Sequence, residues 1–123
     1  MNLQNINVDK VYLAAGYTDM RLGIDGLAVL CEYVHNIDPM KNVLFLFCGR
    51  KSDRIKGLLW QEDGYLLLYK RLSCGRFRWP RNKNEVLELI EQQLRWLLDG
   101  LSITQKTSIK QVPKRGENTL YKA

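Results

Sequence analysis

Val43-Leu44-Phe45-Leu46-Phe47-Cys48 is the stretch of sequence that decides the fold. Six apolar residues follow one another with no polar residue among them, and Gly49 comes directly after. A strand with one face in water alternates apolar and polar residues, whereas a strand that is covered on both faces does not. The run therefore predicts the central strand of a sheet, with both of its faces buried.

A hairpin is predicted on the C-terminal side of this run. Residues 54–61 and 65–72 are both strand-like, and the Asp63-Gly64 dipeptide between them is a strong hairpin signal. As a two-residue turn, this dipeptide would place Lys56 opposite Arg71. Like charges that face each other across two strands repel. We therefore expect the far end of the hairpin to hold an anion or to remain in water.

A strand and a helix are predicted on the N-terminal side. Residues 11–15 are apolar and strand-like, and Gly16 ends them. A turn over residues 17–21 leads into a segment in which apolar residues recur at the spacing of one helix face. These apolar residues are Ile24, Leu27, Ala28, Cys31 and Val34.

A second helix is predicted from about Glu85 to Asp99. Asn82, with Glu85 three residues later, resembles a capping box, and Gly100 is placed to end the helix. Its expected buried stripe consists of Val86, Ile90, Leu94 and Leu97.

These elements predict an α+β fold. We expect a mostly antiparallel sheet of four to five strands with two helices packed on one of its faces. The chain of 123 residues is expected to form a single domain over residues 1–105. The polar and basic residues 106–123 are expected to form a flexible tail.

Composition limits the functional class. No apolar run approaches the 18 residues that a membrane span needs, and residues 1–5 do not resemble a secretory signal. The three cysteines, Cys31, Cys48 and Cys74, are widely spaced, which favours free thiols in the cytoplasm. Their spacing with His35 matches no zinc-ligand pattern. We therefore predict no metal site, no cofactor and no membrane association.

Positive charge is concentrated in the middle of the chain. The net charge is +6, but residues 41–83 alone hold eleven basic and three acidic side chains. From residue 64 to residue 84 there is no acid, and aromatic residues lie among the cations. A surface of one sign with interleaved aromatics is typical of nucleic-acid binding, because paired phosphates release counterions and aromatic rings stack on bases.

We therefore predict a DNA-binding surface in this region. Its candidate residues are Arg50, Lys51, Arg54, Lys56, Lys70, Arg71, Arg76, Arg78, Trp79 and Arg81. In the segment of residues 76–80 cations and aromatics alternate, and we read it as a short edge strand or an extended loop. Phe77 is expected to be buried and Trp79 to be partly accessible. The alternative is that the aromatics belong to the core and the cations form a solvated sheet end that discourages edge pairing.

Catalytic signals are weak. His35 is the only histidine, so a Ser-His-Asp or Cys-His arrangement would have to use it, and no paired motif supports this. The acidic residues are scattered rather than gathered for metal-dependent phosphoryl chemistry. No glycine-rich phosphate loop is present. The sequence therefore predicts a protein that is not an enzyme.

Several ordered motifs resemble one known family. They are Tyr17-Thr18-Asp19-Met20-Arg21, Ile24-Asp25-Gly26-Leu27, Leu44-Phe45-Leu46-Phe47-Cys48-Gly49-Arg50, Asp53-Arg54-Ile55-Lys56, Tyr69-Lys70-Arg71-Leu72, Gly75-Arg76-Phe77-Arg78-Trp79-Pro80 and Gln93-Leu94-Arg95-Trp96-Leu97-Leu98-Asp99-Gly100-Leu101. Together they resemble the small TnpB-type accessory proteins that are encoded beside the transposase in bacterial insertion sequences of family sixty-six.

The resemblance implies an accessory role in DNA transposition, beside a separate and larger transposase. It carries over no catalytic residue. The expected partners are DNA and the transposase of the same element, and the oligomeric state stays open. A rival function is an adaptor that docks on the transposase without direct DNA contact. Asp19 and Arg21 are expected to form a structural turn or an ion pair.

Overall fold

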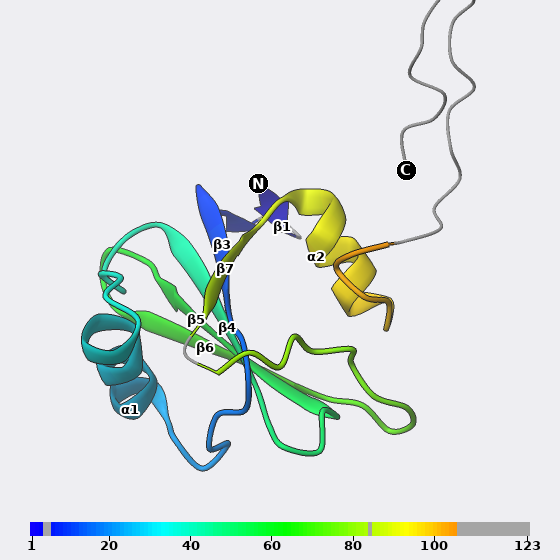
Figure 1. Cartoon of the computed structure of the whole chain (residues 1–123). Helices are drawn as coiled ribbons and strands as arrows, with labels where there is room; N and C mark the ends of the chain where they lie inside the picture. Colours follow the sequence, from blue (N-terminus) through cyan, green and yellow to red (C-terminus); the bar gives the residue numbers. More distant parts are fainter. Residues whose placement is uncertain (4–5, 84, 106–123) are drawn as a thin grey trace, which may run out of the picture.

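A computed structural model describes residues 1–3, 6–83 and 85–105 of the chain (Figure 1). Its centre is a five-stranded sheet with the strand order β6-β5-β4-β3-β7. β3 and β4 run parallel, and the other neighbouring strands are antiparallel. The strands are β3 (Lys10–Ala14), β4 (Val43–Cys48), β5 (Arg54–Trp60), β6 (Tyr65–Arg71) and β7 (Val86–Leu89). The predicted mostly antiparallel α+β fold is confirmed.

The remaining elements are short. β1 (Asn2–Leu3) pairs with β2 (Ile6–Asn7) in a separate two-stranded ladder. The first helix, α1 (Ile24–Val29), continues into the π-helix η1 (Leu30–Val34), and the second helix is α2 (Glu91–Leu98). None of these helices is long and apolar enough to cross a bilayer, within the residues described. The predicted tail, residues 106–123, lies outside the described residues.

β4 is the buried centre of the sheet, as its sequence predicts. All six of its residues are buried. Leu44, Leu46 and Cys48 pack into the core on one face of the sheet, while Phe45 and Phe47 pack into a second core on the other. The Phe45 and Phe47 rings are stacked with their centroids 5.0 Å apart. An unbroken apolar strand therefore requires a cover on both sides of the sheet.

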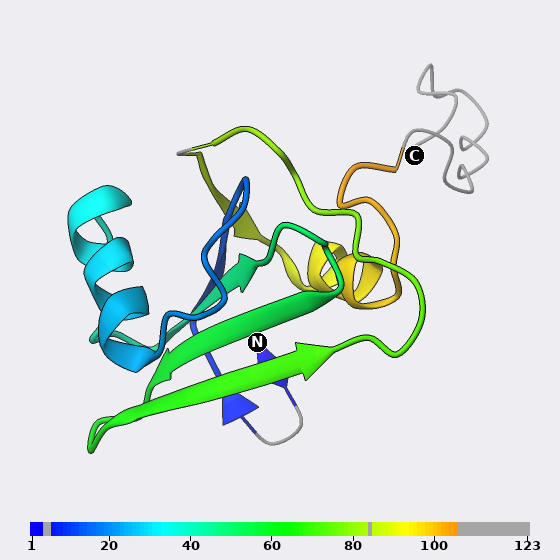
Figure 2. The ribbon, with the colours of Figure 1, turned by 90° about the horizontal axis from the view of Figure 1, so that it is seen from below.

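The two helices lie on opposite faces of the sheet, which corrects the expectation that both pack on one face. Leu27 of α1 packs in the core around Phe45 and Phe47, whereas Leu94 and Leu97 of α2 pack in the other core. Figures 1 and 2 both show the sheet between α1 and α2. The physical reason is the apolar character of both faces of β4, since a face left open to water would expose its side chains.

The first half of the predicted second helix is a strand. Residues 86–89 form β7, which pairs with β3 and closes the edge of the sheet. The helix begins only after Ile90, whose N–H donates to Oε1 of Gln93 at 3.0 Å. Ile90 is 64% exposed, so it does not belong to the predicted buried stripe. Gly100, with a φ of +80°, lies directly after the helix as predicted.

Asn82 and Glu85 do form the predicted side-chain contact, but it does not cap a helix. Nδ2 of Asn82 donates to Oε2 of Glu85 at 3.0 Å, and β7 follows. A capping pattern thus stands in front of a strand here. Residues 86–89 form a strand despite the local helix signal, because hydrogen bonds to the edge of β3 outweigh local helix preference.

The hairpin is present with a longer turn than predicted. Gln61 donates its N–H to the carbonyl oxygen of Gly64 at 2.8 Å, and Glu62 adopts a left-handed φ of +61°. The loop therefore has four residues and Trp60 pairs with Tyr65. The register moves by two residues, which leaves every side chain on its predicted face. The pair of like charges is accordingly Arg54 and Arg71, not Lys56 and Arg71.

Candidate functional site

Three connections meet at one end of the sheet, the lower end in Figure 1. They are the segment after β3, the turn between β4 and β5, and the long segment after β6. In the β4–β5 turn Ser52 has a left-handed φ of +58° and donates its N–H to the carbonyl oxygen of Gly49 at 2.9 Å. Gly49 lies against Met20 so closely that a Cβ atom on it would be 2.6 Å from Met20 Cγ. The β4–β5 turn and the segment after β3 are therefore packed together.

The segment after β6 is fixed to the other two connections by backbone hydrogen bonds. Phe77 donates its N–H to the carbonyl oxygen of Ser52 at 2.7 Å, and Gly16 donates its N–H to that of Pro80 at 2.8 Å. Residues 76–80 have extended-loop rather than strand structure. One of the two alternatives open from the sequence, the extended loop, is therefore the observed one.

Trp79 is a core residue, which corrects the expectation of an accessible stacking surface. Only 5% of Trp79 is exposed, and its indole Nε1–H donates to the carbonyl oxygen of Ala14 at 2.8 Å. Phe77, with 3% exposed, is buried as predicted. Strict alternation would place both aromatics on one side of the segment, and that side faces the core. Arg76 and Arg78 point to the exposed side.

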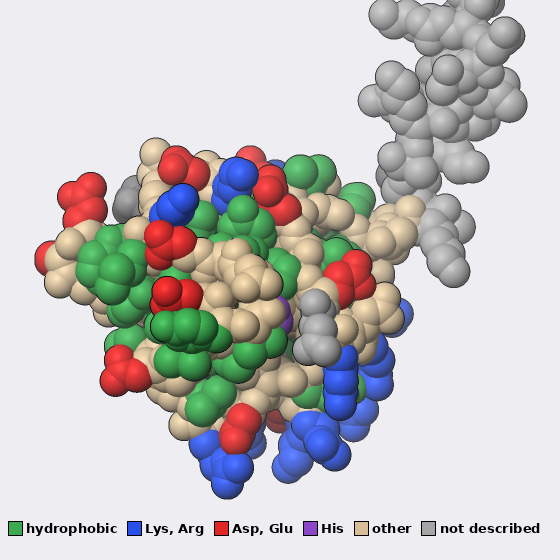
Figure 3. All heavy atoms as spheres, turned by 60° about the vertical axis from the view of Figure 1, so that its left-hand side comes forward, with side chains coloured by type: hydrophobic (Ala, Val, Ile, Leu, Met, Phe, Trp, Pro, Cys, Tyr) green, Lys and Arg blue, Asp and Glu red, His purple; other side chains and the backbone are tan. Residues whose placement is uncertain are grey.

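Seven of the predicted cations converge at this end of the molecule. We call them the basic end, and they come from the β4–β5 turn, the paired ends of β5 and β6, and the segment after β6. Figure 3 shows Lys and Arg side chains gathered along the lower edge of the molecule. The residues of the basic end are Arg50, Lys51, Arg54, Arg71, Arg76, Arg78 and Arg81.

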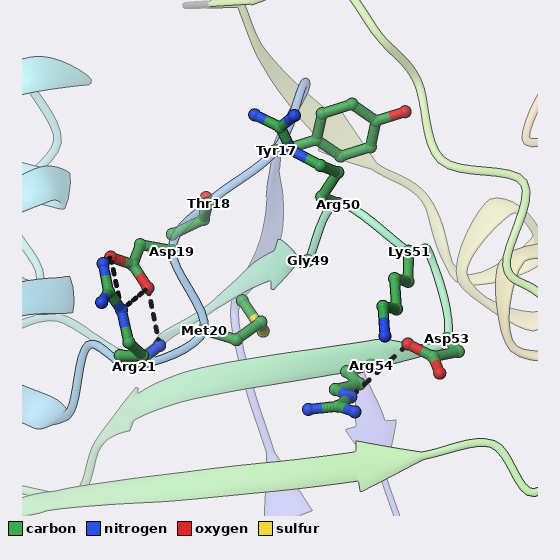
Figure 4. Close-up of a pocket in the computed structure, with 10 residues that line it drawn as sticks. All are labelled: Tyr17, Thr18, Asp19, Met20, Arg21, Gly49, Arg50, Lys51, Asp53 and Arg54. Atoms are coloured by element: carbon green, nitrogen blue, oxygen red, sulfur yellow. Dashed lines mark hydrogen bonds and ion pairs between the residues drawn. The ribbon is translucent and has the colours of Figure 1, made fainter.

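An open hollow of about 490 Å³ lies within the basic end (Figure 4). Arg50 and Lys51 line it from the β4–β5 turn, Arg54 lines it from the start of β5, and residues 17–21 line it from the opposite side. The two carboxylates in its lining, Asp19 and Asp53, each have an arginine partner. A second hollow is lined by residues 76–82 among others, which include Arg76, Arg78 and Arg81. The arrangement offers cationic groups on both sides of a space open to solvent.

Arg54 and Arg71 lie directly opposite each other in the antiparallel ladder of β5 and β6. Such a like-charge pair is unfavourable unless a counter-charge is near. Asp53 supplies one, with its Oδ1 at 3.5 Å from Nε of Arg54. One carboxylate for two guanidinium groups leaves a net positive charge at this end of the β5–β6 ladder, to which an anion would be attracted.

Besides Trp79, two of the predicted site residues, both lysines, do not join the basic end. The ammonium of Lys56 donates to the carbonyl oxygens of Met20 and Leu22 at 2.7 and 2.8 Å, so it serves the fold. Lys70 is exposed, but it lines an apolar groove beneath α2, with Leu94 among the other lining residues. Alternation along β6 separates Lys70 from its neighbour at position 71.

Tyr17 is an aromatic residue of the hollow that the charge pattern alone did not reveal. It is half-buried and lines the hollow, and the guanidinium carbon of Arg81 lies 5.6 Å from its ring centroid. Tyr17 opens the motif of residues 17–21, which is the signal that could have found it. Its ring takes the position that the sequence assigned to Trp79, beside the cations.

The ion pair expected between Asp19 and Arg21 is present. The two side chains are joined at 2.8 Å, and the Arg21 backbone N–H also donates to Asp19 Oδ1 at 2.9 Å. Hydrogen bonds from the Arg21 side chain and backbone lower the pKa of Asp19 to about 2. Asp19 therefore stays ionised at neutral pH and shapes the rim of the hollow without repelling an anion as a lone carboxylate would.

Two of the three thiols are buried, whereas the third, Cys74, is exposed in the segment after β6. Burial raises the pKa of Cys31 and Cys48 to about 12, so neither thiol is a nucleophile at neutral pH. Burial lowers the pKa of His35, which stacks on Phe45 with ring centroids 5.5 Å apart. Across residues 1–3, 6–83 and 85–105, no three His, Cys, Asp or Glu side chains are grouped as metal ligands.

Comparison with known proteins gives two kinds of similarity. A family model described as "IS66 Orf2 like protein" matches residues 9–108. Two proteins of Sinorhizobium fredii are similar along most of the chain. "Uncharacterized protein y4hO" is 37% identical over 75% of this chain and 80% of its own length. "Uncharacterized protein y4jC" is 28% identical over 78% of this chain and 82% of its own length. No solved structure matches significantly.

Proposed function

Because the chain belongs to the IS66 Orf2-like family, whose role is accessory to transposition, we propose that it acts by binding DNA at the basic end. The binding is non-enzymatic and takes place in the cytoplasm. Its partners are the DNA of the element and the transposase of the same element. The observation that carries this proposal is the convergence of seven cations at one end of the molecule, three of which line an open hollow whose two carboxylates are already paired.

The chemistry of the hollow suits a phosphate backbone. Guanidinium groups bind phosphate oxygens in a two-pronged geometry, and every phosphate that is neutralised releases condensed counterions. The repulsion between Arg54 and Arg71 would be relieved by a phosphate placed between them. Tyr17 supplies an aromatic ring on which a base that leaves its stack can rest.

A matched pair of double variants tests the proposal. Arg50→Ala/Lys51→Ala removes two cations from the basic end. Lys10→Ala/Lys41→Ala removes two exposed cations at the N-terminal ends of β3 and β4, which is the end of the sheet away from the basic end. The change in net charge is the same in both variants. Affinity for a labelled duplex of the element's end sequence is measured by fluorescence anisotropy at about 0.1 M salt. We expect the first variant to bind about tenfold more weakly or worse, because two phosphate contacts are lost.

The control variant should bind within about twofold of the unaltered protein. Equal loss in both variants would mean that net charge alone governs binding, and the basic end would not be a site. No binding by the unaltered protein would favour the adaptor function, in which the chain docks on the transposase without touching DNA. Incubation with plasmid DNA and Mg²⁺ or Mn²⁺ should leave the plasmid intact, as a non-enzymatic role requires.

A further inference from the structure

The surface formed by α1 and η1 exposes apolar side chains that no other described residue covers. Val29 is 52% exposed, Tyr33 73% and Val34 47%. Together with the carboxylates of Asp25, Glu32 and Asp38 these residues form what we call the α1 face. Figure 3 shows hydrophobic and acidic side chains intermixed on the side of the molecule that carries α1.

A π-helical turn accounts for the exposure of one of these side chains, Val34. The N–H of His35 donates to the carbonyl oxygen of Leu30, five residues earlier, at 3.0 Å. The wider turn changes the phase of the helix, so Val34 leaves the apolar face that regular helical spacing predicted, while Cys31 remains buried. Insertions of this kind are frequent at functional sites. The helix thus presents apolar side chains on its outer side as well as its inner side.

The α1 face carries a charge opposite to that of the basic end. Between residues 22 and 40 there are three carboxylates and no Lys or Arg. α1 packs against β6, whose Tyr65 packs against the core on this face of the sheet. Burial raises the pKa of Tyr65, and the Cys31 group and the three carboxylates raise it further. An acidic surface repels a phosphate backbone, so DNA is the wrong occupant for this face.

We propose that the α1 face is a docking surface for a protein segment in which Lys or Arg side chains flank apolar ones, and that the transposase of the same element supplies this segment. The identity of that partner rests on the proposed accessory function, while the chemistry of the segment rests on the face itself. Exposed apolar patches with a polar rim mark protein-binding sites, and Tyr is enriched among the residues that dominate such interfaces. Carboxylates at the rim select a basic partner over an acidic one.

Calorimetric titration of the purified transposase into the full-length chain tests this assignment. Tyr33→Ser removes the most exposed aromatic of the face, and Ile90→Ser is its matched control, since Ile90 is 64% exposed at the start of α2 on the opposite side of the sheet. We expect Tyr33→Ser to weaken transposase binding about tenfold or more and Ile90→Ser to change it by less than about twofold. Both variants should melt like the unaltered protein, because both side chains are exposed.

A charge-reversal variant tests the role of the carboxylates in transposase binding. Glu32→Lys should weaken transposase binding at low salt, and the loss should shrink above about 0.5 M salt, where exposed charges are screened. Peptides from basic, apolar stretches of the transposase should compete with the whole protein. DNA affinity of Tyr33→Ser should be unchanged, which separates this proposal from the function of the basic end.

Four results would overturn the assignment. They are the absence of transposase binding, equal binding by all variants, competition by acidic rather than basic peptides, and loss of DNA affinity in Tyr33→Ser. Light scattering tests whether the α1 face binds a second copy of the chain. If the unaltered chain self-associates and Tyr33→Ser makes it monomeric, the α1 face binds a second copy of the chain instead.

Discussion

Replacement of Trp79 distinguishes a core residue from a contact residue. Trp79→Ala removes a side chain that is 95% buried among the residues of the α2-side core and leaves the Ala14 carbonyl without its indole partner. Truncation of a buried aromatic costs about 3–5 kcal/mol of unfolding free energy. Trp79→Phe retains a ring but not the N–H donor, so its cost is about 1–3 kcal/mol, the penalty for an unsatisfied buried carbonyl plus the volume lost.

Urea unfolding at neutral pH, followed by circular dichroism, measures both costs. Arg78→Ala serves as the control, because Arg78 is the exposed neighbour of Trp79. Its unfolding free energy should change by less than about 0.5 kcal/mol, while its DNA affinity should fall. Trp79→Phe should bind DNA normally under conditions in which it is folded.

A specific result would refute the reasoning. If Trp79→Ala unfolds at the same urea concentration as the unaltered protein and yet loses DNA or transposase binding, Trp79 is a contact residue. The hydrogen bond to Ala14 would then not describe the molecule in solution. Because the segment after β6 is anchored through this indole, the position of Arg76 and Arg78 at the basic end would also be wrong.

Three further predictions concern the surroundings of the hollow. The side-chain carboxyl of Asp19, followed by NMR, should titrate with a pKa of about 2, and this pKa should return toward its ordinary value in Arg21→Ala. Since the folded pKa lies below the unfolded one, the ion pair stabilises the fold above about pH 4, and this stabilisation is lost as the pH falls toward 2. An unshifted pKa of Asp19 would disprove the pair. A thiol reagent at neutral pH should label the exposed Cys74 quickly and the two buried thiols only in denaturant, so rapid labelling of more than one thiol in the native state would contradict the burial described. Gly49→Ala should cost about 1–3 kcal/mol of unfolding free energy, with much of the loss recovered when Met20→Ala is added, and a cost that Met20→Ala leaves unchanged would mean that the two residues are not in contact.

The sequence predicts the sheet well because its signals are local. The unbroken apolar run of β4 identifies the central strand, and Asp63-Gly64 locates the hairpin. The turn length could not be read from the dipeptide, since a left-handed Glu62 lengthens the loop through backbone hydrogen bonds that involve no sequence signature. The register therefore moved by two residues, which changed the partner of Arg71 but not the face of any side chain.

Long-range pairing explains what the sequence did not predict. Residues 86–89 belong to a stretch whose apolar residues recur at helical spacing, but they pair with β3 and form β7. Trp79 lies on the same side of an alternating segment as the buried Phe77, and the carbonyl oxygen of Ala14, which accepts its indole N–H, is supplied by a distant strand. The sequence cannot distinguish Lys56 from the other cations of the charged region. In the fold its ammonium donates hydrogen bonds to two backbone carbonyl oxygens. Each of these outcomes depends on residues distant in the chain.

The salt dependence of DNA binding tests the central claim most directly. Binding constants for a labelled duplex are measured by anisotropy from about 50 to 300 mM salt, for the unaltered chain and for Arg50→Ala/Lys51→Ala. With about five phosphates contacted, the logarithm of the binding constant should fall against the logarithm of salt with a slope of about −4 to −5. The variant should flatten that slope by about one to two units. A slope near zero, or a slope that the variant leaves unchanged, would contradict the account of the basic end as a DNA-binding site.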